Sequence, residues 1–344
     1  MDRRISYAQA ISEALVQGME HDPNVFIFGL GVDDYKGIFG TTREAFLKFG
    51  GTRVFDTPAS ENALTGIAIG AALNKKRPVL VHARNDFMFL ALDQMINNAA
   101  KWKYTYAGKS TVPIVVRGII GKGWGQGPTH SQSLQSVLAH FPGLIVAMPA
   151  NACDVKGIIL QSLKSDAPVV ILEHRSLYDL QCHVPPERFT VPFGRARIAR
   201  AGTDVTVAAV SWMAVQALKA ADELSKVGIS VEVIDPVTVQ PLDEQTIVRS
   251  VRKTGRLIAA DTSWLRCSFA SEVAAIAAEK AFDYLKSPVK RIAWPECPCP
   301  VSKALEEEFY PTHEDIVRAV YELMDRKDKH VFTEKVTDTF VGPY

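Results

Sequence analysis

The sequence lacks a charge of one dominant sign. Its 344 residues carry 39 Lys and Arg against 38 Asp and Glu, which leaves a formal net charge of +1. A strong positive field is what draws a protein to nucleic acid or to an anionic membrane surface. The composition gives no reason for either, so we expect no nucleic-acid partner and no membrane partner.

Long apolar runs are missing as well. No stretch approaches the roughly 20 apolar residues that cross a bilayer, and the N-terminus from Met1 to Tyr7 lacks the apolar segment of a secretory signal peptide. The five cysteines are scattered and odd in number, which argues against a disulfide framework. We therefore expect a cytoplasmic protein. Cys297 and Cys299 form the one close pair, and we expect them to be structural rather than zinc ligands.

The usual nucleotide-binding patterns are also absent. The loop 118–129 carries glycines at alternate positions, Gly121, Gly123, Gly125 and Gly127, which is not the G-x-G-x-x-G of a dinucleotide site. Lys122 follows Gly121 without the other residues of a phosphate-binding P-loop. A nicotinamide-dependent dehydrogenase is an alternative that predicts NAD binding to the isolated chain, and we expect no such binding.

What is present is a regular alternation of strands and helices. The length suits two domains. Strands are predicted at 25–30, 54–56, 78–82, 112–117, 144–148, 168–173, 204–210, 230–235, 256–260 and 289–293. Helices are predicted at 6–20, 45–49, 61–73, 85–102, 131–140, 152–165, 214–227, 243–254, 271–282 and 312–324. This pattern indicates an α/β protein with two doubly wound domains.

A proline-rich connector marks the boundary between the domains. We predict a first domain over 1–184, a linker over 185–202, a second domain over 203–325 and a polar tail over 326–344.

Candidate site residues gather where the strands of the first domain end. Ligands of open parallel sheets lie at the carboxyl ends of the strands, and the loops 30–35, 57–61, 82–87 and 118–130 follow such ends. Glu61 opens a helix that Ser60 can cap, so by itself it is a carboxylate that complements the helix dipole. Its position beside the other loops favours a binding role, and His130 becomes a candidate acid or base.

Several ordered motifs resemble the beta subunit of thiamine-diphosphate-dependent 2-oxo acid dehydrogenases, of the pyruvate, branched-chain and acetoin dehydrogenase type. In the first domain they are Asp56-Thr-Pro-Ala-Ser-Glu61, Gly66-Ile-Ala-Ile-Gly-Ala-Ala72, Arg77-Pro78, the Asp93-Gln94 to Lys101 stretch, and His130-Ser-Gln132. In the second they are Gly202-Thr-Asp-Val-Thr206, Ile234-Asp-Pro236, Ala281-Phe-Asp-Tyr-Leu285 and Pro288-Val-Lys-Arg-Ile292. The similarity extends to about residue 324.

The resemblance implies a transketolase-like pyrimidine-binding domain followed by a transketolase C-terminal domain. It also implies thiamine diphosphate shared with an alpha subunit, in an α2β2 assembly. The family's Gly-Asp-Gly motif, which holds the diphosphate and Mg²⁺, lies on the alpha chain and is absent from this sequence. We therefore expect half a site, no metal ligand on this chain, and Mg²⁺ held mainly by the partner. K⁺ and a lipoyl acyltransferase are further expectations of the resemblance.

The resemblance assigns roles to residues that match the family by position. Glu61 matches the acid that activates the cofactor's aminopyrimidine, Phe87 the aromatic residue that packs on the pyrimidine, and His130 the histidine that handles protons on the substrate. Leu30 is placed among the cofactor-binding residues, where the family usually carries an acidic pair, so a proton relay between active sites is in doubt. The cofactor itself stabilises the carbanion.

Two departures bear on the substrate and the assembly. The family's Glu-Phe-Met-x-Phe is replaced by 81–85, which makes His82 and Arg84 candidate substrate residues for a phosphate or an extra carboxylate. A solvent-facing role for both is the alternative. The family's Gly-Gly run is replaced by 264–269, which weakens the case for docking in a large complex.

The first hypothesis is thus the beta subunit of a 2-oxo acid dehydrogenase that decarboxylates its substrate. The second is a split transketolase or acyloin-forming enzyme that uses the same cofactor on a sugar or small aldehyde. The third is a non-catalytic subunit, against which the joint presence of Glu61, Phe87 and His130 argues.

Overall fold

The computed structural model describes residues 3–326, so the predicted tail lies, from residue 327 onward, outside the described residues. The chain forms two compact units. Within the described residues, the N-terminal unit comprises 3–120 and Val137–Phe193, and the C-terminal unit comprises Gly121–Ser136 and 194–326. The segment Gly121–Ser136, which carries the alternate glycines and His130, therefore groups with the C-terminal unit.

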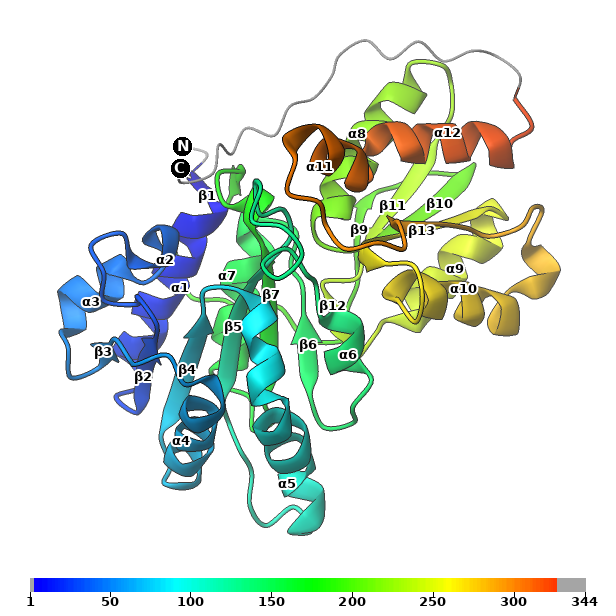
Figure 1. Cartoon of the computed structure of the whole chain (residues 1–344). Helices are drawn as coiled ribbons and strands as arrows, with labels where there is room; N and C mark the ends of the chain where they lie inside the picture. The colour runs from blue at the N-terminus through cyan, green and yellow to red at the C-terminus, as the bar shows by residue number, and fades with distance from the viewer. Residues whose placement is uncertain (1–2, 327–344) are drawn as a thin grey trace. The chain divides into compact units, whose positions relative to one another are not determined.

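A parallel sheet forms the centre of the N-terminal unit (Figure 1). Six of its strands run in the order β6-β7-β5-β4-β2-β3, and all their pairings are parallel. Their bounds are β2 Val25–Gly29, β3 Val54–Phe55, β4 Arg77–His82, β5 Val115–Ile120, β6 Ile145–Ala147 and β7 Val169–His174. These strands are continuous apolar runs because such a sheet is buried on both faces.

The helices of this unit pack on the sheet and on one another. They are α1 Tyr7–His21, α2 Gly37–Gly40, α3 Arg43–Phe49, α4 Glu61–Leu73, η1 Asn85–Ala91, η2 Asp93–Ala99, α5 Ala100–Thr105, α7 Ala152–Ser162 and η3 Arg175–Leu177. Helix α1 packs against α7, and α4 packs on β4 and against η1. A short antiparallel pair, β1 Arg4–Ser6 with β8 Gln181–His183, joins the two ends of the unit.

The C-terminal unit holds a five-stranded sheet in the order β14-β13-β10-β11-β9. Its strands are β9 Arg197–Arg200, β10 Val205–Ala209, β11 Val231–Asp235, β13 Leu257–Trp264 and β14 Lys290–Trp294, with β12 Thr238–Gln240 outside this sheet. All pairings are parallel except that of β9 with β11. The unit's helices are α8 Trp212–Ser225, α9 Glu244–Thr254, α10 Phe269–Lys280, η4 Phe282–Tyr284, α11 Lys303–Phe309 and α12 His313–Leu323. Figure 1 shows α8 and α12 on one face of the sheet and α9 and α10 on the other.

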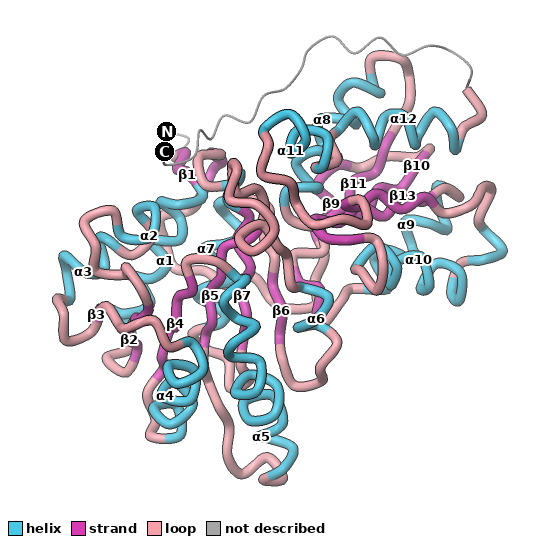
Figure 2. Tube along the Cα trace, in the orientation of Figure 1, coloured by secondary structure: helices cyan, strands magenta, loops and turns pink. Residues whose placement is uncertain are grey.

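The two α/β units confirm the predicted fold class, and Figure 2 shows their alternating strands and helices. The single helix predicted over 85–102 is wrong. It is a 3-10 turn (η1), a π-helical stretch (η2) and a short α-helix (α5) in succession. The predicted helix over 131–140 is shorter, because α6 spans Gln135–Ala139.

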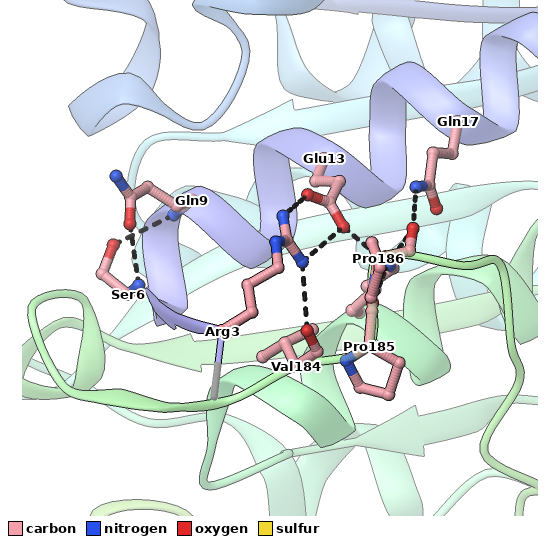
Figure 3. A network of polar contacts seen from close by, with 9 residues as sticks. Arg3, Ser6, Gln9, Glu13, Gln17, Val184, Pro185 and Pro186 are labelled. Carbon is pink, nitrogen blue, oxygen red and sulfur yellow. Dashed lines mark hydrogen bonds and ion pairs between the residues drawn. The ribbon is translucent and has the colours of Figure 1, made fainter. Parts of the chain in front are cut away.

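A polar network fixes the start of α1 against the end of the N-terminal unit (Figure 3). Ser6 and Gln9 form a reciprocal capping box at the first turn. Arg3 pairs with Glu13 and donates to the carbonyl of Val184 at 3.0 Å. The Lys156 ammonium, fully buried in α7, contacts Glu13 Oε1 at 2.5 Å and the Pro185 carbonyl at 2.6 Å.

Among residues 3–326, no helix has both the length and the apolar character that crossing a bilayer requires.

Candidate functional site

The strand ends that were predicted to carry the site form one edge of a parallel sheet. Strands β3, β2, β4 and β5 are neighbours and all run in the same direction, so their carboxyl ends meet along one edge. The segments that follow these ends hold Leu30, Glu61 and the stretch 82–87. The structure thus confirms that these three segments share one edge.

Glu61 is the first residue of α4 and is half-buried. The expected cap by Ser60 is wrong, because the Ser60 side chain makes no capping hydrogen bond and its backbone lies at φ −161° and ψ 71°. The helix start therefore leaves its N–H groups to other partners, and a carboxylate in its first turn remains favoured by the dipole. Within the described residues, the Glu61 carboxylate has no hydrogen bond and no ion pair.

The loops after β2 and β3 are tied together. The backbone N–H of Gly31 donates to the Asp56 carboxylate at 2.6 Å. Gly29, the last residue of β2, has φ +144°, and a Cβ there would lie 2.3 Å from the Val81 carbonyl oxygen of β4. This close approach requires glycine. Leu30 follows with 48% of its surface exposed, so the loop presents an apolar side chain outward.

His82 is the last residue of β4 and Arg84 directly precedes η1, and both are buried, each with 5% of its surface exposed. The solvent-facing alternative for these residues is therefore wrong. Burial lowers the pKa of His82 to about 4, so its ring is neutral near pH 7. His82 Nε2 has no hydrogen-bond partner among residues 3–326. The Arg84 guanidinium lies 3.8 Å from the Asp86 carboxylate, so its charge is balanced in part by a neighbour.

Phe87 lies in η1 and is half-buried. The turn is seated on β5, where a Cβ on Gly118 would lie 2.3 Å from Met88 Cε and 3.3 Å from Asn85 Cβ. Because η1 also packs against α4, Phe87 and Glu61 belong to adjacent elements. The η1 turn replaces the first part of the predicted α-helix, so the side chains of 85–91 do not follow α-helical spacing.

His130 belongs to the C-terminal unit, so its position is described within that unit. It is half-buried, and its Nδ1 lies 2.9 Å from the Thr129 hydroxyl. The preceding loop uses left-handed backbone at Gly121, Gly125 and Gly127, with φ between +70° and +86°. The alternate glycines therefore shape a tightly turning loop rather than a phosphate cradle at a helix start.

Sequence reasoning missed a buried charge network in the N-terminal unit. Arg117 of β5 makes a two-pronged ion pair with Glu173 of β7, at 2.6 and 2.9 Å. Tyr178 donates to Glu173 at 2.8 Å, and Arg117 also reaches the Thr41 hydroxyl at 3.2 Å. Arg117 and Glu173 each close a predicted apolar strand, and charges in strands buried on both faces need partners. That pattern would have identified the pair.

Cys299 is buried against Trp294 and Phe309, as a structural cysteine would be. Across residues 3–326, no group of three or more His, Cys, Asp and Glu side chains is arranged to hold a metal ion.

Comparison with protein families matches both units. Residues 3–181 match the transketolase pyrimidine-binding domain, and residues 194–316 match the transketolase C-terminal domain.

Curated relatives cover nearly the whole chain. The beta subunit of acetoin:2,6-dichlorophenolindophenol oxidoreductase from Bacillus subtilis is 41% identical over 94% of this chain and 98% of its own. The mitochondrial pyruvate dehydrogenase E1 component subunit beta-2 from Oryza sativa is 41% identical over 92% of this chain and 85% of its own. Among solved structures, a split-gene transketolase in an inactive beta4 tetramer shares the fold, with a TM-score of 0.75 at 23% identity, over 94% of this chain and 99% of that one.

Proposed function

The chain belongs to the thiamine-diphosphate-dependent family that includes the beta subunits of the pyruvate dehydrogenase E1 component and of acetoin oxidoreductase, and from this premise we propose that it is the beta subunit of a 2-oxo acid dehydrogenase. The observation that carries the proposal is Glu61. It is a half-buried carboxylate at a parallel-sheet edge, and it has no protein partner among the described residues. A carboxylate so placed is available to a ligand.

The residues of the N-terminal unit fit the pyrimidine end of the cofactor. Glu61 would hold a proton against the ring nitrogen of the aminopyrimidine, since a carboxylate is the natural partner of a weakly basic ring nitrogen. Phe87, on the adjacent η1, would pack on the ring, and the exposed Leu30 would supply apolar contact. Thiamine diphosphate, when bound, supplies the carbanion-stabilising chemistry. His130 would donate and accept protons at the substrate oxygen.

An alpha subunit would supply the remainder of the site. This chain has no Gly-Asp-Gly motif, and no metal-holding cluster is found in the part that the structure describes. We therefore assign the diphosphate and Mg²⁺ to the partner, in an α2β2 assembly. The N-terminal unit offers a surface for it. Ile67 of α4 is 58% exposed, and Phe89 and Leu90 of the adjacent η1 are exposed as well.

A second candidate function uses the same cofactor on a small acyloin, aldehyde or sugar. His82 favours it, because a buried neutral imidazole with an unpartnered Nε2 is suited to a hydroxyl or carbonyl group rather than to an anion. The partial neutralisation of Arg84 by Asp86 acts in the same direction. Relatives named for acetoin, a neutral hydroxyketone, agree with this reading.

The two candidates differ in their acceptor. We would copurify the chain with its alpha subunit and assay reductive acylation of lipoamide alongside carbon–carbon bond formation and cleavage. Lipoamide acylation from a 2-oxo acid supports the first proposal, with a lipoyl acyltransferase as the next partner. Carbon–carbon chemistry without lipoamide acylation supports the second. Absence of both, with cofactor bound, contradicts a catalytic role.

A further inference from the structure

The loop that carries His130 packs against another segment of the C-terminal unit. We define the clamp segment as residues 299–310, which contains α11, and the glycine loop as residues 121–131. The clamp segment follows β14, and both segments belong to the C-terminal unit. Contacts between them involve side chains at three separate positions of the clamp segment.

Glu306 is the central contact. Its side chain is buried, with 2% of the residue exposed, although its neighbours Glu307 and Glu308 on α11 are exposed. The backbone N–H groups of Gly123, Trp124 and Gly125 and the Lys122 ammonium stabilise its ionised form, while burial, the larger effect, raises its pKa. Its Oε1 atom has no hydrogen-bond partner among the described residues. The Glu306 carboxyl group is thus buried against a turn whose backbone N–H groups point at it. Removing the side chain would leave these N–H groups facing an empty cavity.

Besides Glu306, two further side chains of the clamp segment contact the glycine loop. A Cβ on Gly127 would lie 2.7 Å from Val301 Cγ2, so the loop backbone passes directly over that side chain. The Tyr310 hydroxyl lies beside Ser131 and 3.3 Å from Cys299 Sγ. Tyr310 is itself fixed by edge-to-face contacts with Trp294 and Phe309, at centroid distances of 5.5 and 5.0 Å.

The turn that Glu306 contacts lies directly against His130 and Ser131. The turn that faces Glu306 packs on the end of the loop, because a Cβ on Gly123 would lie 2.5 Å from Ser131 Oγ and 3.2 Å from the His130 carbonyl oxygen. Beyond His130, Gln135 donates to the buried Asp261 of β13 at 2.7 Å. The glycine loop is therefore anchored on both sides of the histidine.

We propose that the clamp segment fixes the glycine loop and that Glu306 is a positioning residue for His130. The proposal rests on the acid–base role assigned to His130, and it adds a residue of the C-terminal domain to the machinery of that step. A glycine-rich loop without such support samples many conformations, and a shift of about 1 Å in a catalytic group costs up to about 100-fold in rate.

The test compares three variants of the full chain, each copurified with its alpha subunit. In Glu306→Ala, hydrogen exchange of the amides in 121–131 should speed up by about tenfold or more, and kcat and kcat/KM should fall together by about 10- to 100-fold. Glu306→Gln keeps the shape and an acceptor oxygen, so it should restore most of both. Glu308→Ala, on the exposed side of the same helix, should match the wild type.

Unchanged exchange in Glu306→Ala would overturn the clamp. Faster exchange spread evenly over the C-terminal unit would overturn it too, because that is general destabilisation. Faster exchange confined to the loop, with kcat unchanged, would overturn the positioning role. His130→Ala, assayed beside these variants, tests the acid–base assignment itself. If it retains turnover, the proposed role of His130 fails, whereas the exchange pattern of Glu306→Ala still decides whether the clamp exists.

Discussion

At the scale of single residues, the site is defined by side chains that the fold leaves without protein partners. Glu61 and His82 have ordinary neighbours in sequence, yet neither the Glu61 carboxylate nor His82 Nε2 is hydrogen-bonded within residues 3–326. Buried polar atoms are nearly always paired. The buried His82 Nε2 is such an exception, and the half-buried Glu61 carboxylate lies at the same sheet edge, which favours a ligand there.

His82 makes a prediction about stability and pH. Its pKa is about 4 in the folded chain and 6.5 in the unfolded chain. The unfolded chain therefore binds more protons between these values, and stability is lost as pH falls from 6.5 towards 4. The shift corresponds to about 3 kcal/mol. Urea unfolding at pH 7 and pH 4.5 should show a larger loss for the wild type than for His82→Gln. Equal losses in the two proteins would contradict the burial of a neutral imidazole.

At the scale of elements, charged side chains bind neighbouring helices and strands together. Lys156 of α7 is fully buried between Glu13 of α1 and the carbonyls of Pro185 and Pro186. It thereby joins two helices to the segment that leads into the C-terminal unit.

Removing the Lys156 ammonium should be costly. Lys156→Ala leaves the Glu13 carboxylate with one partner fewer, the Pro185 carbonyl without this donor, and the Pro186 carbonyl with Gln17 as its remaining donor. The free energy of unfolding should therefore fall by about 3 kcal/mol. Lys164→Ala, an exposed lysine just beyond the same helix, should change it by less than about 0.5 kcal/mol. Chemical denaturation of both variants gives the comparison. Similar values for the two would show that the network adds little.

The sequence predicts elements best where one physical constraint dominates. Strands β2, β4 and β7 were predictable because burial on both faces makes each a continuous apolar run. The division of 85–105 into η1, η2 and α5 was not predictable, since its apolar spacing is also that of one continuous α-helix. The close packing of Met88 and Asn85 on Gly118 is visible only in the fold. Helix α11 was missed because Pro295, Pro298 and Pro300 indicate a loop and because it buries little besides Glu306 and Phe309.

Some residues of the candidate site could likewise be predicted from the sequence, and others could not. Glu61 and His130 stand in ordered motifs that the sequence displays, and Phe87 is assigned by its position in the resemblance. The role of Glu306 cannot be read from the sequence, because its partners are backbone N–H groups of a distant loop and not side chains with a recognisable pattern. The burial of His82 and Arg84 also needed the fold.

At the scale of the whole molecule, the chain is an incomplete enzyme by our account. The diphosphate end of the cofactor would belong to another subunit, and α4 and η1 present exposed apolar side chains where such a subunit would dock.

This docking surface can be tested without an activity assay. Ile67→Lys places a charge in the middle of the proposed interface and should weaken α–β assembly by at least about tenfold, because burying an unpaired charge is unfavourable. Leu47→Lys, at an equally exposed position on α3, should assemble normally. Native mass spectrometry of coexpressed subunits measures both. Full assembly of Ile67→Lys would place the interface elsewhere.

The proposed activation of the cofactor by Glu61 is measured most directly by the rate at which the thiazolium C2 proton of bound thiamine diphosphate exchanges with deuterium in the α–β complex. Glu61→Gln should slow this exchange by about 100-fold or more while cofactor and partner still bind. Glu44→Gln, a carboxylate in the first turn of the exposed helix α3, is the matched control and should exchange as the wild type does. A wild-type exchange rate in Glu61→Gln would show that Glu61 does not activate the cofactor.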